Sequence, residues 1–124
     1  MYRSIDRGKH RVARFSSTCV HMGANAEHWC GLHQARMDDE VPVWFVEFDS
    51  YFGRDGIYGY EDDGWRFAML SKAGMQAAKD QQFYPDVMHV HDWHTSPVAA
   101  FLKTWDRILS PLSNTASVLT IHNI

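Results

Sequence analysis

The second half of this 124-residue chain alternates between helical and strand patterns of apolar residues. Residues 65–80 are built from good helix formers, and residues 87–91 follow as a short apolar strand. Pro97 then opens a helical stripe of apolar side chains that runs to Leu109. Residues 117–122 form a last buried strand. Strands that alternate with helices predict an α/β fold, in which a Rossmann-like parallel sheet is joined by crossover helices.

The first half has the pattern of a β-hairpin followed by a third strand. Residues 9–22 are rich in β-branched and aromatic side chains, and residues 28–37 alternate well enough to be their hairpin partner. The strongest strand pattern in the chain is VPVWFVEFD at 41–49. Its apolar side chains are almost continuous, which predicts burial on both faces.

Composition excludes several classes of protein. The formal net charge is −3 and the pI is near 6.2, so the clustered basic surface of a nucleic-acid-binding protein is not expected. The sequence shows no signal-peptide pattern and no apolar run long enough to cross a bilayer, so we expect a cytoplasmic protein with no membrane partner. Cys19 and Cys30 are spaced unlike a zinc motif and are expected to be free thiols.

Polar side chains follow the last two predicted strands. HDWHT (91–95) follows one strand, and the pair His122 and Asn123 ends the other. Ligands of open α/β sheets bind outside the carboxyl ends of the strands, so both segments should face one crevice. Asp92 and His94 could bind the hydroxyl groups of a polar ligand, or Asp92 could simply cap a turn or helix. His122 and Asn123 could equally be a binding pair or a polar exit from the sheet.

A metal site is a second interpretation of the same stretch. His89 and His91 lie on one side of a strand, and His94 could add a third ligand, as in a metal-dependent hydrolase. The order of the residues differs from the H-x-H-x-D-H pattern of metallo-β-lactamase-type hydrolases, and no distal ligand set is identifiable. We therefore expect no metal, and we interpret His89 as a core histidine bonded to a backbone group.

The glycine-rich segment SYFGRDGIYGYEDDGW (50–65) is predicted to be a loop. Asp62 or Asp63 at its end could cap the following helix. Its aromatic side chains, between Tyr51 and Tyr60, leave open a third interpretation, a non-catalytic glucan-binding module.

Five stretches of the sequence together resemble the bacterial glycogen synthases and plant starch synthases. VPVWFVE with YFGRDGIYG resembles that family's VPVYFIE and YFDRPGIYG, and DGWRFAMLSKAGMQ resembles its ERFALLSRAALE helix. PDVMHVHDWHTSPVAAFLK is similar to PDIVHAHDWHTGLVPAYLK, and SVLTIHNI is similar to TVFTIHNLAYQG. The resemblance covers residues 29–124 in order and spacing, and residues 1–28 match weakly.

The resemblance implies part of the N-terminal, Rossmann-like half of a GT-B glycosyltransferase. Such enzymes transfer glucose from ADP-glucose to the non-reducing end of an α-1,4-glucan with retention, and they need no cofactor. Asp92 and His122 match cleft residues of the family and are predicted to be catalytic. Asn123, His94 and Thr95 are predicted to bind substrate. The implied partners are ADP-glucose and glycogen or starch, and a plant source would imply the plastid.

Two departures from the family pattern bear on activity. The K-x-G-G-L-x-D-V loop, whose lysine meets the nucleotide phosphates in the family, is absent from the sequence, and so is the C-terminal nucleotide-binding half. The resemblance therefore implies a fragment of a synthase, which we expect to be inactive alone.

Overall fold

The computed structural model describes residues 4–23, 26–38 and 40–122 of the chain. These residues belong to two compact units, Met1–Arg66 and Phe67–Ile124, each of which has its own sheet. The predicted site residue Asn123 lies outside the described residues.

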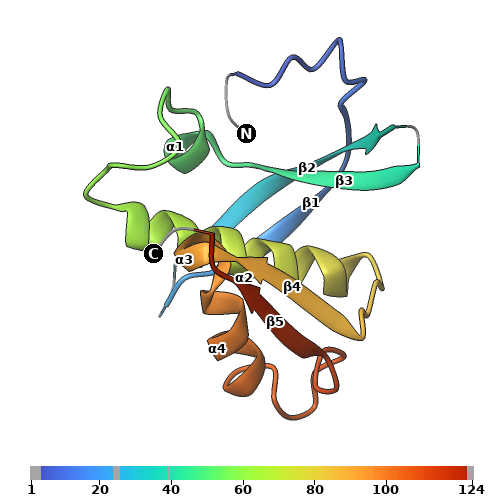
Figure 1. Cartoon of the computed structure of the whole chain (residues 1–124), viewed down its shortest axis with the longest axis vertical. Helices are drawn as coiled ribbons and strands as arrows, with labels where there is room; N and C mark the ends of the chain where they lie inside the picture. Colours follow the sequence, from blue (N-terminus) through green and yellow to red (C-terminus); the bar gives the residue numbers. More distant parts are fainter. Residues whose placement is uncertain (1–3, 24–25, 39, 123–124) are drawn as a thin grey trace. The chain divides into compact units, whose positions relative to one another are not determined.

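The first unit is built on an antiparallel sheet of three strands, β1 (Ala13–His21), β2 (Glu27–Met37) and β3 (Val41–Glu47). They run side by side in the order β1-β2-β3, with β2 in the middle (Figure 1). The predicted hairpin of the first two strands is confirmed. The single helical turn α1 (Asp49–Phe52) follows β3, at the beginning of the segment predicted to be a loop.

The predicted burial of both faces of β3 is wrong. Val41 is 50% exposed and Trp44 is 38% exposed, and none of the described residues of the strand is fully buried. The reason is its place in the sheet. β3 pairs antiparallel with β2 instead of joining a parallel sheet, and an antiparallel sheet can leave one face to solvent.

Arg66 organises the long loop that leads from α1 to the next helix. Its side chain is fully buried, and its Nε and Nη2 donate to the carbonyl oxygens of Tyr51 at 2.8 Å and Ile57 at 3.1 Å. Its Nη1 donates to the carboxylate of Asp63, and the guanidinium lies over the ring of Tyr60. One buried cation therefore ties the loop, at Ile57 and Tyr60, to the helices at its two ends.

The two acidic residues at the end of this loop bind the loop itself. Asp62 accepts two hydrogen bonds of 2.6 Å from the guanidinium of Arg54. Asp63 accepts from the backbone N–H groups of Gly59 at 2.6 Å and Tyr60 at 3.1 Å. The hydrogen bonds described for these carboxylates join the loop and the Arg66 side chain, not the first backbone N–H groups of the helix, so they give the predicted helix-capping role no support.

Glu47, at the end of β3, joins the sheet to the segment that precedes it. Its carboxylate bonds the buried imidazole of His33 at 2.9 Å and accepts from the guanidinium of Arg7 at 2.5 Å. The hydrogen bond with His33, helped by Arg7, lowers the pKa of Glu47 to about 2. The carboxylate is therefore held in its charged form by two partners distant in sequence.

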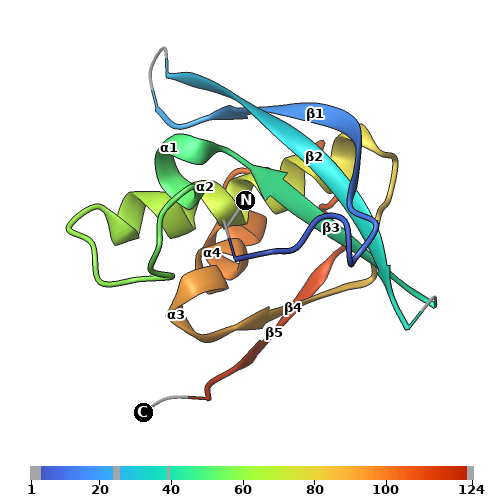
Figure 2. The same ribbon diagram turned by 90° about the horizontal axis from the view of Figure 1, so that it is seen from above.

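The second unit contains the predicted parallel pair. Helix α2 (Asp63–Asp80) begins in the first unit and continues into the second, and β4 (Val87–His91) and β5 (Ala116–Thr120) pair in parallel. The short helices α3 (Asp92–Thr95) and α4 (Pro97–Lys103) lie between the two strands in sequence, and α3 follows β4 directly (Figure 2). This arrangement confirms the α/β class, the crossover connection and the hairpin on the N-terminal side.

An apolar core joins one face of this pair to its helices. Its members come from α2, β4, α4 and the segment before β5: Met75, Val90, Val98, Leu102 and Leu112. The buried side chains of α2 include Phe67, Ala73 and Ala77, whose spacing places them on one face of the helix. Each Å² of apolar surface that such a core removes from water stabilises the fold by about 25 cal/mol, and this is the main favourable contribution of the core.

Helix α4 ends at Lys103, earlier than the apolar stripe predicts. Beyond this point Asp106 is held by contacts outside a regular helix. Its carboxylate accepts a hydrogen bond from Lys79 Nζ at 3.0 Å, and its backbone N–H donates to the carbonyl of Phe101. Leu109 has a φ of 60°, which a right-handed helix does not allow, and it is fully exposed. The ion pair and this turn override the helical periodicity.

Cys19 and Cys30 are free thiols, as expected, and burial raises the pKa of Cys30 to about 11. Among the described residues no helix is long and apolar enough to cross a membrane.

Replacing Arg66 with methionine should destabilise the protein strongly. The substitution removes the charged partner of Asp63 and leaves the carbonyls of Tyr51 and Ile57 without their donor, and a buried acceptor that loses its donor costs about 1–3 kcal/mol. Urea unfolding followed by circular dichroism measures this loss. Arg107→Met, at an exposed position, is the matched control and should change stability by less than about 0.5 kcal/mol. Equal effects of the two variants would contradict the bracing role of Arg66.

The Glu47 ion pairs predict a loss of stability in acid. A carboxyl whose pKa is lower in the folded than in the unfolded state stabilises the fold above its unfolded pKa, and this contribution disappears as pH falls toward its folded pKa. The free energy of unfolding should therefore fall between about pH 4.5 and pH 2, and Glu47→Gln should flatten this slope. Urea titrations across this range test it, with exposed Glu61→Gln as control. A slope unchanged by Glu47→Gln would refute the assignment.

Candidate functional site at the ends of β4 and β5

The parallel register of β4 and β5 brings their following segments together. His91, the last residue of β4, pairs with Thr120, the last residue of β5. Asp92 comes directly after the first strand, and His122 comes two residues after the second. The predicted strand 117–122 therefore ends earlier, at Thr120, which leaves His122 in the segment that leaves the sheet.

Asp92 and His122, the two predicted catalytic residues, are in direct contact. The backbone N–H of His122 donates to Oδ1 of Asp92 at 2.6 Å, across 30 positions of sequence. Asp92 has a φ of 53°, in the left-handed region, where aspartate is more frequent than most residues but is still uncommon. Asp92 thus has a rare backbone conformation at the carboxyl end of a parallel strand. Strained residues are frequent at functional sites, and ligands of α/β sheets bind at these strand ends.

The imidazole rings near this contact form a row on the exposed side of the strands. His91 Nδ1 and His122 Nε2 are 2.9 Å apart, within hydrogen-bond distance. His89 Nε2 is 2.7 Å from the hydroxyl of Thr120. The interpretation of His89 as a core histidine bonded to the backbone is therefore wrong, because it is exposed and its partner is a side chain.

Thr95 and His94, which are predicted to bind substrate, have local contacts in this structure. The Thr95 hydroxyl accepts from the backbone N–H of His91 at 2.7 Å and donates to the carbonyl of the same residue at 2.9 Å. The ring of His94 is stacked on Trp93, with centroids 4.2 Å apart, and meets Phe67 edge to face at 4.6 Å. Thr95 closes the turn after β4, and His94 packs beside it.

Two residues of this region carry roles that sequence reasoning did not assign. His91 contacts the predicted catalytic residue His122, and Thr120 anchors His89. The two-residue period of a β-strand could have predicted these neighbours, because residues 89 and 91 share one face with residues 118 and 120 of the parallel partner. What the period does not give is which nitrogen of each ring meets which partner.

The metal interpretation finds no support in the described part of the chain. No group of three or more His, Cys, Asp or Glu side chains among those residues is arranged to hold a metal ion. The ring of His94 packs on Trp93 and Phe67, whereas those of His89 and His91 lie together on the exposed strand face.

The aromatic loop in the first unit is also unlike an open sugar platform. The ring of Tyr60 has the guanidinium groups of Arg54 and Arg66 each 4.8 Å from its centroid, and Phe52 is buried. Tyr58 is 63% exposed. Most of the loop's aromatic surface among these residues therefore contributes to the loop's own structure.

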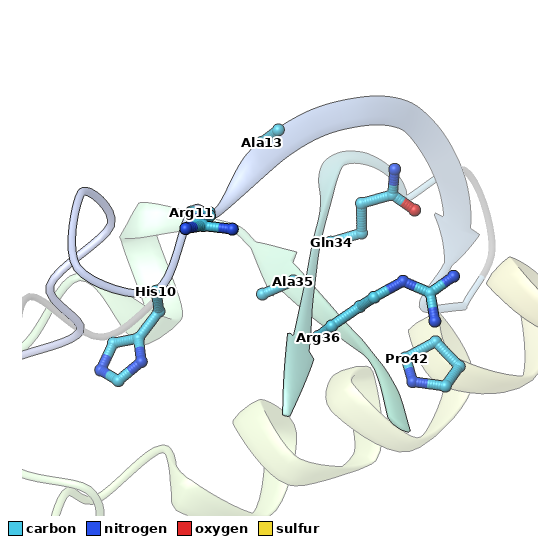
Figure 3. A pocket seen from close by; sticks show the side chains of 7 residues that line it. All are labelled: His10, Arg11, Ala13, Gln34, Ala35, Arg36 and Pro42. Carbon is cyan, nitrogen blue, oxygen red and sulfur yellow. The ribbon is translucent and has the colours of Figure 1, made fainter. Parts of the chain in front are cut away.

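A separate cavity of about 310 Å³ lies in the first unit, at the ends of β1 and β2. His10, Arg11, Ala13, Gln34, Ala35, Arg36 and Pro42 line it. Figure 3 shows that the side chains of His10 and Arg36 point in different directions, without converging on one point. Ligand sites are marked by polar groups that converge, so this cavity is a weaker candidate than the strand ends.

Comparisons with known proteins agree with the sequence motifs. The sequence model of the starch synthase catalytic domain matches residues 1–124. Glycogen synthase 1 of Geobacter sulfurreducens is 40% identical over 100% of this chain and 26% of its own length. The glycogen synthase of Treponema denticola is 36% identical over 99% of the chain and 26% of its length, and that of Bacillus subtilis is 38% identical over 94% and 24%.

The fold is similar to that of a solved plant enzyme. The catalytic domain of starch synthase IV from Arabidopsis thaliana, bound to ADP and acarbose, superposes with a TM-score of 0.81 at 23% identity. The match covers 90% of this chain and 23% of that one. The chain spans about a quarter of the length of the curated relatives it matches. By the extent of the family match and by these identities, the chain belongs to the starch synthase catalytic domain family.

Proposed function

We propose that the full-length protein carrying this chain transfers glucose from ADP-glucose to the non-reducing end of an α-1,4-glucan, with retention of the anomeric configuration. The contact between the Asp92 carboxylate and the His122 amide carries this proposal, because it builds one polar surface from the carboxyl ends of two parallel strands. Ligands of such sheets bind at these ends. The relatives named glycogen synthase, and the ADP and acarbose bound to the plant enzyme, support the same class of substrates.

Asp92 and His122 are the proposed catalytic residues of this surface. A glucosyl group that leaves a nucleotide diphosphate develops positive charge at its anomeric carbon, and a preorganised carboxylate stabilises that charge. The hydrogen bond of 2.6 Å from His122 fixes the orientation of the Asp92 carboxylate. The imidazole of His122 has a second nitrogen besides Nε2 with which to bind a sugar hydroxyl. Neither residue needs to act as a nucleophile in this role.

Asn123, His94 and Thr95 complete the proposed substrate-binding set. Thr95 closes the turn that presents Asp92, and His94 packs on Trp93 beside it. Asn123 follows His122 in the sequence. We further propose that the reaction needs no cofactor or metal ion, that glycogen or starch is the acceptor, and that the protein acts in the cytoplasm, or in the plastid of a plant.

Transfer of radiolabelled glucose to glycogen by the full-length protein tests this function. ADP-glucose should be a donor, and the product should contain α-1,4 linkages. Asp92→Asn and His122→Ala should each lower kcat/KM by about 100-fold, because the loss of one oriented group at a reacting centre costs that much. Asp86→Asn, at the opposite end of β4, and His21→Ala, on β1, are the matched controls and should keep full activity.

Two results would contradict the proposal. The first is the absence of glucosyl transfer by the full-length wild-type protein with either ADP- or UDP-glucose. The second is transfer in which Asp92→Asn and His122→Ala are as active as their controls.

A further inference from the structure

His91 lies in the middle of three imidazole rings beside the proposed catalytic contact. Its ring centroid is 4.3 Å from that of His89 and 5.2 Å from that of His122, and the planes of His91 and His122 differ by 21°. The hydroxyl of Thr120 holds His89 at 2.7 Å. The His91 ring is therefore flanked on one side by an anchored neighbour and on the other by His122.

The contact between His91 and His122 couples the tautomers of the two neutral rings. A neutral imidazole has one N–H donor nitrogen and one acceptor nitrogen. The hydrogen bond that one nitrogen makes determines whether that nitrogen carries the proton, and the other nitrogen then takes the opposite role. Across the 2.9 Å between His91 Nδ1 and His122 Nε2, one nitrogen donates and the other accepts. The Nε2–H tautomer is the more stable form of a free histidine side chain. If His122 Nε2 donates, both rings adopt it, and Nδ1 of His122 becomes an acceptor.

The backbone of His122 is held independently of its ring. Its N–H donates to Asp92 at 2.6 Å, and the ring is then oriented by His91. Asp92 therefore fixes where the residue lies, and His91 fixes how its imidazole is turned. A ring without the second contact can rotate about χ1 and χ2 and present either nitrogen.

We propose that His91 is a positioning residue for His122: its Nδ1 accepts a hydrogen bond from His122 Nε2–H, so that His122 presents Nδ1 to a donor hydroxyl of the bound glucosyl group. This role rests on the proposed glucosyltransferase function of the full-length protein. His91 does not itself touch the substrate in this account. Its removal misorients a catalytic group, and a displacement of about 1 Å at such a group can lower the rate by about 100-fold.

Nitrogen NMR of the full-length protein, labelled with 15N at its histidines, tests the coupling without any activity measurement. At pH 8, a long-range 1H–15N spectrum should show a pyrrole-type Nε2 and a pyridine-type Nδ1 for His122, the pattern of a single tautomer. His91→Leu should convert this to an averaged pattern like that of exposed His10. His91→Asn should keep the pattern, because the asparagine amide oxygen takes the place of Nδ1. An averaged pattern in the wild type, or no change in His91→Leu, would overturn the proposal.

A double-mutant cycle in the full-length protein tests the consequence for transfer. His91→Leu should lower kcat by about 10- to 100-fold with a smaller effect on KM, and His91→Asn should restore most of it. In the His122→Ala background, His91→Leu should have no further effect, because His91 acts through that ring. Additive losses would overturn the positioning role while leaving the proposed function standing. A wild-type protein that transfers no glucose would contradict the proposed function itself.

Discussion

Parallel pairing of β4 with β5 is the constraint on which the candidate site depends. The register that sets His91 beside Thr120 makes both strands end at the same level, so the residues that follow them become neighbours. Without that register, Asp92 and His122 would be 30 positions apart in sequence with no reason to meet. The apolar core around Val90 holds β4 against its helices and leaves the opposite face of the strand to His89 and His91. Packing and chemistry are thus divided between the two faces of one strand pair.

The left-handed backbone conformation of Asp92 is a local cost of the contact between Asp92 and His122. A left-handed conformation in a residue other than glycine costs of order 1 kcal/mol or more and persists where surrounding contacts determine it. Here those contacts are the Thr95 hydroxyl, which closes the turn on His91, and the His122 amide, which binds the carboxylate. The strained residue therefore lies in a turn that the Thr95 hydroxyl closes, and its carboxylate is held by the His122 amide.

The sequence predicts the strands, their parallel pairing and the location of Asp92 and His122 at one edge of the sheet, since these follow from hydrophobic periodicity and from the rule that parallel strands end at one edge. It does not predict the end of α4, because the ion pair of Asp106 with Lys79 is a tertiary contact. It also does not predict the burial of β3, since an unbroken apolar run is compatible with both a central and an edge strand. The sequence also does not predict the contact between His91 and His122, because the period of a strand determines which residues share a face but not how their rings are oriented.

A structure of the full-length protein with ADP and a glucose-containing inhibitor bound is the most direct test of the central claim, that the ends of β4 and β5 line the sugar site. The account predicts that polar atoms of Asp92 and His122 lie within about 3 Å of hydroxyl groups of the bound sugar. A sugar that binds elsewhere, with the contact between Asp92 and His122 intact and no ligand near either residue, would contradict it.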